Sequence, residues 1–235
     1  MPAVRSKLAL HGTRSDKKEA LVALLGSWLI TELYSRIAEY LDVRTSTLEY
    51  VSLVFSFACV WLSRTENIYS MSTGIVSSVV MGVFLLRIEL VGQGWIQFVY
   101  YVPIQIVGWY QWSKGGTGRT ELPVTSLRVR GWAYHIGLLL ATWVSTRIAF
   151  GMIYENPRLI WWDTSIVAAS IVAQTLMTTK KVECWIFWIV PVNISSIALY
   201  LHTDVPAFAV MYGIFLANAV WGWRSWVRAE RIDAG

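Results

Sequence analysis

The stretch from Lys181 to Trp226, KVECWIFWIVPVNISSIALYLHTDVPAFAVMYGIFLANAVWGWRSW, decides the fold of this chain. It holds two hydrophobic segments, each close to the ~20 residues that a helix needs to cross a lipid bilayer. A looser copy runs from Arg64 to Trp112. The copies close on related strings, GWYQW at 108–112 and GWRSW at 222–226, and each opens with a basic residue two positions before a glutamate (Arg64 and Glu66; Lys181 and Glu183). Two similar multi-helix units in one membrane chain are typical of transporters.

The composition indicates a polytopic helical membrane protein. The 235 residues are 55% apolar and 15% charged, whereas a soluble domain has roughly 25% charged residues. Long stretches lack charge altogether, as membrane-spanning helices do. The two cysteines, Cys59 and Cys184, lie in apolar segments of different units. We interpret them as small buried residues and not as a disulfide.

The charge pattern and the motifs argue against nucleic-acid binding and against catalysis. The net charge is +5, but in a membrane protein Lys and Arg mark the cytoplasmic loops, and no basic–aromatic module of a nucleic-acid-binding protein is present. The histidines are scattered without metal-ligand spacing, and no glycine-rich phosphate loop occurs. The sequence therefore predicts neither an enzyme nor a metal or cofactor site.

Seven hydrophobic spans follow one another after residue 47. The first three form repeat one, the fourth is a connector that belongs to neither repeat, and the last three form repeat two. The predicted fold is an all-α integral membrane protein with three helices, one connector and three helices, in which the connector makes the two repeats parallel. The ranges are 48–112 for repeat one (spans 48–62, 68–86 and 94–112), 131–150 for the connector, and 161–226 for repeat two (spans 161–177, 185–201 and 206–226).

The residues before the first span allow two interpretations. Residues 1–19 form a polar, basic tail, and residues 20–41 are helical in pattern, with one charged stripe of Glu32, Arg36 and Glu39. Such a stripe is typical of an amphipathic helix at the membrane surface. The segment could equally cross as an extra helix with its stripe against protein. The basic tail slightly favours crossing, because it prefers the cytoplasmic side.

The distribution of Lys and Arg predicts the orientation. Basic residues are more numerous on one side, in the loops after the first, third, fifth and seventh spans: Arg64, Lys114, Arg119, Arg128, Arg130, Lys180, Lys181, Arg224, Arg228 and Arg231, against Arg44, Arg87, Arg147 and Arg158. We therefore expect a multi-pass protein of the inner (cytoplasmic) membrane, with the glycine-containing link 113–130 and the tail 227–235 in the cytoplasm.

Two tryptophans are the first candidates for a binding site. Trp185 and Trp188 are three residues apart and so share one helical face. Indole rings stack on flat heteroaromatic rings and attract cations, although Trp is also common as an anchor at membrane surfaces. We assign the tryptophans near the other predicted helix ends to such a belt: Trp109, Trp112, Trp161, Trp162, Trp223 and Trp226.

Amides at membrane depth are the second kind of candidate. Gln105, Asn193 and Asn218 are costly in hydrocarbon, so they should face a cavity or hydrogen-bond to other helices. Pro103 and Pro191 lie two residues before the first two of these amides, and helix breaks near the midplane often line substrate sites. For four serines the simpler interpretation is that they are small residues that let helices pack closely: Ser77, Ser78, Ser195 and Ser196.

The string WDTSIVAASIVAQTLMTTKKVECWIFW at 162–188, together with GWYQW and the basic C-terminal tail, resembles the PnuC family of bacterial vitamin transporters. The resemblance covers roughly residues 48 to 228. It implies a seven-helix SWEET-like fold, a homotrimer in the lipid bilayer, and uptake of nicotinamide riboside by facilitated diffusion. Flux is then sustained by cytosolic phosphorylation of the vitamin. Relatives in this family carry thiamine or riboflavin, which stay open as alternatives, as does a different class: an intramembrane enzyme or an assembly subunit.

The family's binding residues match this chain unevenly. Trp185 and Trp188 fit the WxxW pair, and Gln105 fits the amide three residues before Gly-Trp. Asn193 lies one residue beyond the usual family position, which Val192 occupies. Where relatives often have asparagine three residues after a glycine, this chain has Ser77 after Gly74. Asn218 and Tyr101 complete the predicted substrate-binding set.

Overall fold

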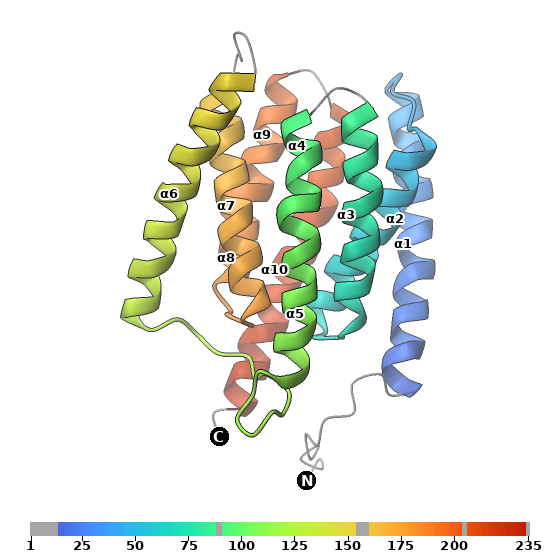
Figure 1. The fold of residues 1–235 in the computed structure, drawn as a ribbon. Coiled ribbons are helices and arrows are strands. Elements are labelled where there is room, and N and C mark those ends of the chain that lie inside the picture. Colours follow the sequence, from blue (N-terminus) through green and yellow to red (C-terminus); the bar gives the residue numbers. More distant parts are fainter. Residues whose placement is uncertain (1–13, 88–90, 154–159, 204–205, 234–235) are drawn as a thin grey trace.

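The computed structural model describes residues 14–87, 91–153, 160–203 and 206–233, and this part of the chain is a bundle of upright helices (Figure 1). Short π-helical segments, labelled η, interrupt two of the helical rods. The elements are α1 (Arg14–Tyr40), α2 (Thr47–Arg64), α3 (Tyr69–Arg87), α4 (Val91–Ile96), η1 (Gln97–Tyr101), α5 (Val102–Lys114), α6 (Val129–Ile153), α7 (Ile160–Thr178), α8 (Cys184–Phe187), η2 (Trp188–Ile194), α9 (Ser195–His202) and α10 (Pro206–Asp233).

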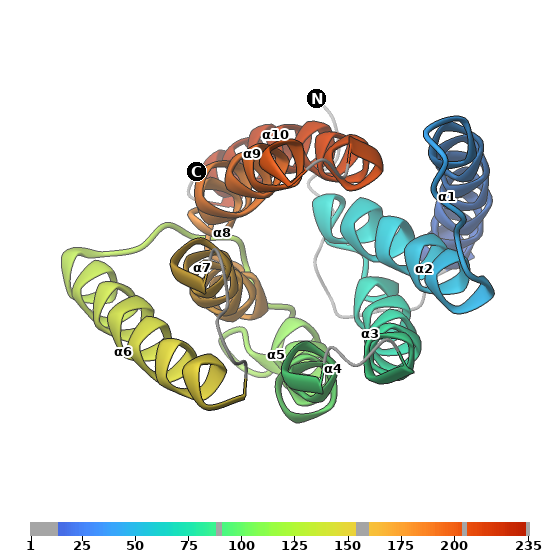
Figure 2. The ribbon, with the colours of Figure 1, turned by 90° about the horizontal axis from the view of Figure 1, so that it is seen from above.

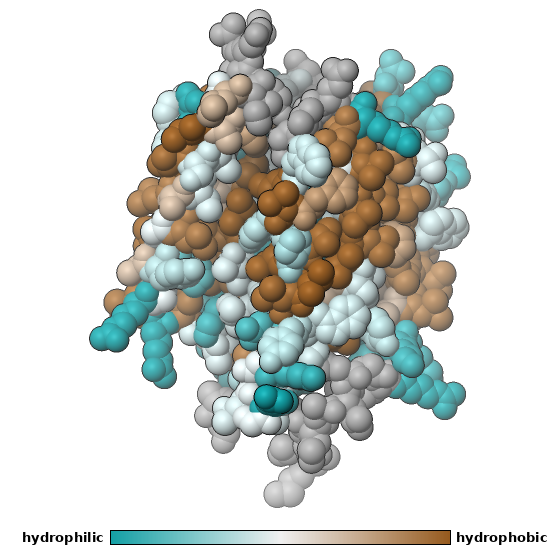
Figure 3. All heavy atoms as spheres, viewed as in Figure 1, coloured by the Kyte–Doolittle hydropathy of each residue, from teal (hydrophilic) through white to brown (hydrophobic). Residues whose placement is uncertain are grey.

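The surface and the helix lengths are those of a membrane protein. Apolar side chains cover much of the visible face, and the hydrophilic ones gather toward the two ends (Figure 3). Four helices of the described chain are long and apolar enough to cross a bilayer: Arg14–Tyr40, Tyr69–Arg87, Cys184–His202 and Pro206–Ile232. The predicted all-α, multi-pass class is therefore confirmed.

Local signals explain where the helices of repeat one begin and end. Ser46 caps α2: its hydroxyl accepts from the backbone N–H of Glu49, and the Glu49 carboxylate accepts from the backbone N–H of Ser46. This capping box satisfies N–H groups that the first helical turn leaves without partners. The turn after α2 passes through Glu66 at φ 58°, and the turn after α7 passes through Lys180 at φ 48°. The left-handed conformation is a common way to end a helix.

These two turns reveal the internal repeat. Glu66 and Lys180 are 114 residues apart, and the same spacing relates α2 to α7, α3 to the rod α8–η2–α9, and α4–η1–α5 to α10. Within each unit the first helix packs on the second, and the second on the third. The third rod of each unit also packs on the first helix of the other, α5 on α7 and α10 on α2. The helices thus close a ring in the view from above (Figure 2).

The repeat is larger than the sequence predicted. α6 packs on the outside of α7, and α1 packs in the same way on the outside of α2 (Figure 2). The helix predicted as a connector outside both repeats therefore has a counterpart in α1. In the described chain, the arrangement is two units of four helical rods, α1–α5 and α6–α10.

The predicted boundaries at the N-terminus also change. Residues 14–19, assigned to the basic tail, are the first turns of α1, while residues 1–13 lie outside the described residues. α1 runs alongside α2 and not across the end of the bundle (Figure 1), which is the geometry of an extra crossing helix. Its charged stripe is partly satisfied within the protein: Arg36 pairs with Glu32 at 2.8 Å, and Tyr50 donates to Glu32 at 3.2 Å.

Candidate functional site

A central cavity of about 270 Å³ lies between the two repeats. Its walls come from α2, α3, η1, α5, α7, α8, η2 and α10. All of the residues predicted to bind substrate line it: Ser77, Tyr101, Gln105, Trp185, Trp188, Asn193 and Asn218. The described residues that line the cavity include no Asp, Glu, Lys or Arg. The cavity is therefore an uncharged chamber of aromatic rings, amides and hydroxyls.

Trp185 and Trp188 form the aromatic part of this chamber. Trp185 is almost fully buried and packs edge-on against Trp226, with ring centroids 5.4 Å apart and an interplanar angle of 87°. The indole N–H groups of Trp185 and Trp188 are buried without a hydrogen-bond partner among the described residues. A buried donor without a partner is costly. A ligand acceptor in the cavity would remove that cost.

The π-helix η2 explains how Asn193 reaches the cavity. A π-helix repeats its hydrogen bonds from i to i+5, one residue more than an α-helix. Asn193 therefore lies one wide turn after Trp188 and not four residues after it, and it is buried. The extra residue that separates this chain from the family spacing is absorbed here, at Pro191. The other proline, Pro103, is the second residue of α5, which begins where η1 ends, so the helix irregularities predicted at both prolines are present.

The remaining predicted residues have different surroundings. Gln105 is buried across Gly74, where a Cβ would come within 2.7 Å of its Cδ atom. Asn218 Nδ2 donates to the carbonyl of Val60 at 3.0 Å, so it lines the cavity and also makes an interhelical hydrogen bond. Ser77 hydrogen-bonds to α2, through the Ser56 hydroxyl and the Ser52 carbonyl. It therefore serves helix packing, as the sequence suggested.

Several polar residues of the cavity were not predicted from the sequence. Gln97 and Gln174 line it, and Gln174 is buried in the last turns of α7. The criterion that selected Gln105, an amide at membrane depth, would also have selected Gln174. Tyr212 and Ser170 line the cavity as well, but tyrosine and serine are common in packed membrane helices and gave no distinct signal.

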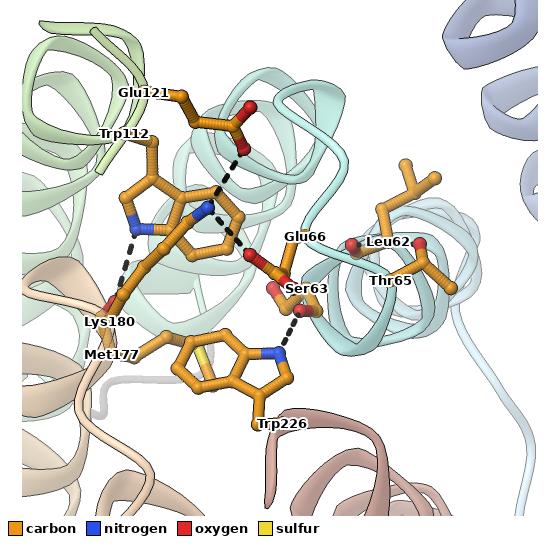
Figure 4. A network of polar contacts seen from close by, with 9 residues as sticks. All are labelled: Leu62, Ser63, Thr65, Glu66, Trp112, Glu121, Met177, Lys180 and Trp226. Carbon is orange, nitrogen blue, oxygen red and sulfur yellow. Dashed lines mark hydrogen bonds and ion pairs between the residues drawn. The ribbon is translucent and has the colours of Figure 1, made fainter. Parts of the chain in front are cut away.

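Beyond one end of the cavity lies a set of residues that we call the Lys180 network: Glu66, Trp112, Glu121, Lys180 and Trp226 (Figure 4). The Lys180 side chain is fully buried, and its Nζ atom lies 2.8 Å from Glu66 Oε2 and 3.0 Å from Glu121 Oε1. The same Nζ lies 4.9 Å from the centre of the Trp112 ring. Two carboxylates and one aromatic face thus replace the water molecules that normally hydrate a lysine ammonium group.

The two tryptophans of the Lys180 network tie the repeats together reciprocally. Trp112 Nε1 donates to the carbonyl of Met177 at the end of α7, and Trp226 Nε1 donates to the carbonyl of Ser63 at the end of α2, both at 3.1 Å. The two bonds are related by the 114-residue spacing of Glu66 and Lys180. Ser63 and Met177 also line the cavity. The Lys180 network therefore adjoins the end of the cavity that is nearest to the link 113–130 and the C-terminus (Figure 1).

This geometry corrects two predictions. Trp112 and Trp226 are fully buried, so their assignment to the interfacial belt was wrong, because each indole N–H has a carbonyl partner across the bundle. The belt assignment is compatible with the exposed rings of Trp109, Trp161 and Trp223. The alignment of the two repeats at their start also differs from the predicted one. Lys180, and not Lys181 or Glu183, corresponds to Glu66, because Glu66 and Lys180 both have a left-handed backbone conformation in the turn that follows a helix.

Gly222 sets the position of Trp185, and this gives a first testable prediction. A Cβ on Gly222 would come within 2.5–2.7 Å of the Trp185 ring. Gly222→Ala should therefore displace the ring and weaken ligand binding, even though alanine is the better helix former by roughly 1 kcal/mol. Gly213→Ala is the matched control on the same helix, since a Cβ there meets nothing within 4 Å.

The measurement for this pair is thermal stability and vitamin affinity of each purified variant. Gly213→Ala should be as stable as the wild type or more so, with unchanged affinity. If Gly222→Ala behaves in the same way, the contact between Gly222 and Trp185 does not position the ring.

A multi-pass helical bundle of two repeats around an uncharged, aromatic cavity defines a membrane transport protein. The comparisons with known proteins agree. The model of the family described as "Nicotinamide mononucleotide transporter" matches residues 46–228. The chain therefore belongs to this family of transporters.

Named relatives support the same family. The chain is 28% identical over 210 residues to nicotinamide riboside transporter PnuC of Escherichia coli (strain K12), covering 79% of this chain and 87% of the relative. It is 28% identical over 221 residues to PnuC of Neisseria mucosa, covering 88% and 82%. The crystal structure of the vitamin B3 transporter PnuC has the same fold, with a TM-score of 0.71, 24% identity, and coverage of 94% of this chain and 99% of that one. The resemblance found in the sequence is confirmed.

Proposed function

We propose that this protein carries nicotinamide riboside across the membrane by facilitated diffusion. The observation that supports this most strongly is the composition of the cavity: two adjacent indoles, amide side chains and no charged residue among the described lining. The riboside is a flat cationic ring with a carboxamide and a neutral sugar. The indoles suit the ring through stacking and cation–π attraction, and Gln105, Asn193 and Asn218 suit the carboxamide and the hydroxyls.

The family description names nicotinamide mononucleotide as the substrate, but the composition of the cavity favours the riboside. A phosphate group requires Lys, Arg or the N–H groups of a helix N-terminus. None of the described lining residues is basic. Riboflavin fits less well because it is larger and neutral, and about 270 Å³ is just below the ~300–1,000 Å³ of usual ligand pockets. Thiamine, a flat cation, is the second candidate, favoured by the same indole pair.

Transport through this cavity requires that the Lys180 network open. Exchange of open ends around a fixed midplane site is the usual mechanism of transporters built from repeats. In this proposal the protein neither hydrolyses ATP nor catalyses a reaction, and a cytosolic kinase traps the riboside by phosphorylation. We also propose a homotrimer in the inner membrane. The family resemblance supports it, as does the largely exposed apolar surface of α6, which packs on α7.

The proposed orientation places the C-terminus and the Lys180 network in the cytoplasm, as the basic loops indicate. Single cysteines at Thr117 and Thr203, both exposed, should then label differently. With Cys59 and Cys184 replaced, a membrane-impermeant maleimide added to intact cells should reach position 203 and not position 117. The opposite pattern would reverse the topology.

Transport itself is tested in proteoliposomes that contain this chain alone. Labelled nicotinamide riboside should equilibrate across the membrane without ATP or an imposed ion gradient, and unlabelled riboside should exchange with it. If neither the riboside nor thiamine nor riboflavin crosses, the chain acts in some other way, for example as an assembly subunit.

A further inference from the structure

A second pocket, of about 140 Å³, adjoins the central cavity. The two share four residues, namely Gln97, Tyr101, Ser170 and Tyr212. The other walls of the second pocket include the first turn of α7 and the last turns of α9. These turns lie at the end of the bundle opposite the Lys180 network (Figure 1). The second pocket therefore lies on the side of the cavity away from the Lys180 network, and we call it the outer pocket.

The outer pocket has a chemistry that the central cavity lacks. Asp163 lines it and brings a carboxylate, whereas the described lining of the central cavity has no charged group. The rings of Tyr200 and Tyr212 also line it and stack on each other, with centroids 5.5 Å apart and an interplanar angle of 21°. The Ser196 hydroxyl is buried there beside Tyr212. A carboxylate, two tyrosine rings and a hydroxyl together suit a flat organic cation with polar substituents.

The internal repeat shows that Asp163 is more than a helix-terminal charge. An acidic residue in the first turn of a helix is favourable to the helix dipole wherever it occurs. Its counterpart, 114 residues earlier by the spacing of Glu66 and Lys180, is Glu49 in the first turn of α2. Glu49 forms the capping box with Ser46 and lines neither the cavity nor the outer pocket. Asp163 lines a pocket, so the two repeats use equivalent carboxylates differently.

We propose that the outer pocket is an entry site that selects organic cations, with Asp163 as the counter-ion. A cation that enters from this end meets the carboxylate and the tyrosine rings first, and then moves past the shared residues to Trp185 and Trp188. This inference rests on the proposed function and deepens it, because it assigns charge selectivity to a site separate from the indole pair. Neutral compounds of the same shape would gain nothing from Asp163.

The test compares the riboside with a neutral isostere, 3-(ribofuranosyl)benzamide, in which carbon replaces the ring nitrogen and removes the charge. Initial uptake into proteoliposomes is measured for each compound, well below saturation and at low ionic strength. Asp163→Asn should lower riboside uptake about five- to tenfold, the size expected for a partly screened charge pair. Uptake of the isostere should stay unchanged. Glu49→Gln, which removes a charge from the equivalent position, should affect neither compound.

The remaining outcomes separate the two proposals. If Asp163→Asn lowers both compounds equally, or leaves the riboside unaffected while the wild type transports it, the entry site is wrong and the transport function stands. If the wild type carries neither compound, the proposed function itself fails. Asp163→Glu keeps the charge and should keep the preference for the cation; loss of that preference in a folded Asp163→Glu variant would also contradict the entry site.

Discussion

Trp188→Ala should weaken the binding of nicotinamide riboside by roughly 5- to 150-fold. A buried stacking contact is worth ~1–3 kcal/mol per ring in base-stacking proteins, and each ~1.4 kcal/mol changes affinity tenfold. Trp188 lines the cavity and its indole N–H has no partner in the described chain, so the loss arises mainly from the missing ligand contact. Calorimetry on the purified variant measures it directly.

Trp185→Ala should weaken the binding of nicotinamide riboside by a similar factor, and it should also lower the stability of the protein. Trp185 is almost fully buried and packs on Trp226, and truncating a buried tryptophan typically costs ~3–5 kcal/mol. Trp226→Ala is no inert control, because it breaks the hydrogen bond to Ser63 in the Lys180 network. Trp223, which is 40% exposed, is the better control. An unchanged affinity in Trp188→Ala, or a loss in Trp223→Ala as large as that in Trp188→Ala, would place the ligand elsewhere.

Lys180→Met should lower the free energy of unfolding by about 2–3 kcal/mol. Removing one partner of a buried ion pair typically costs ~3–5 kcal/mol, and we expect less here because the Glu66 and Glu121 side chains are 21% and 25% exposed. Without the lysine, two carboxylates face each other over Trp112 with no cation between them. The apparent Tm in detergent should fall accordingly, and the fall should be smaller in high salt, which screens the repulsion.

A triple variant of the Lys180 network separates the effect of charge on stability from the effect of packing. Lys180→Met combined with Glu66→Gln and Glu121→Gln removes all three charges, so no unpaired charge remains. It should recover more than half of the lost stability. If the triple variant is no more stable than Lys180→Met alone, the lysine acts through its hydrocarbon stem and not through its ion pairs.

The sequence predicted the class of fold and seven residues that line the cavity, because both depend on properties of local sequence. Long uncharged stretches mark membrane helices, and Gln105, Asn193 and Asn218 stand out as amides in apolar surroundings. Residues 20–41 were harder, because a charged stripe looks the same whether it faces water or protein. The structure adds that α1 pairs with α2 and that Tyr50 donates to Glu32, so part of the stripe contacts protein.

The Lys180 network could not be predicted, because its bonds join residues far apart in the chain. Lys180 looked like one of several basic residues of a cytoplasmic loop, yet its partners are 59 and 114 residues away. Trp112 and Trp226 looked like interfacial anchors for the same reason: position near a helix end predicts a belt, and only the packed structure shows the carbonyls that they reach. The π-helix η2 could not be predicted either, although Pro191 indicated an irregular helix at this position.

The repeat also bears on how this protein can recognise a ligand with two unlike ends. A chamber between two identical halves would present every side chain twice, opposite itself, and would suit a symmetric guest. Here the halves have diverged where they meet the cavity: by the 114-residue spacing of Glu66 and Lys180, Met71 and Gly74 stand opposite Trp185 and Trp188, and Gln105 stands opposite Ala219. The two indoles thus come from one half only, whereas the amides come from both halves, Gln105 from one and Asn193 and Asn218 from the other. A molecule that is flat at one end and hydroxylated at the other therefore meets two unlike walls.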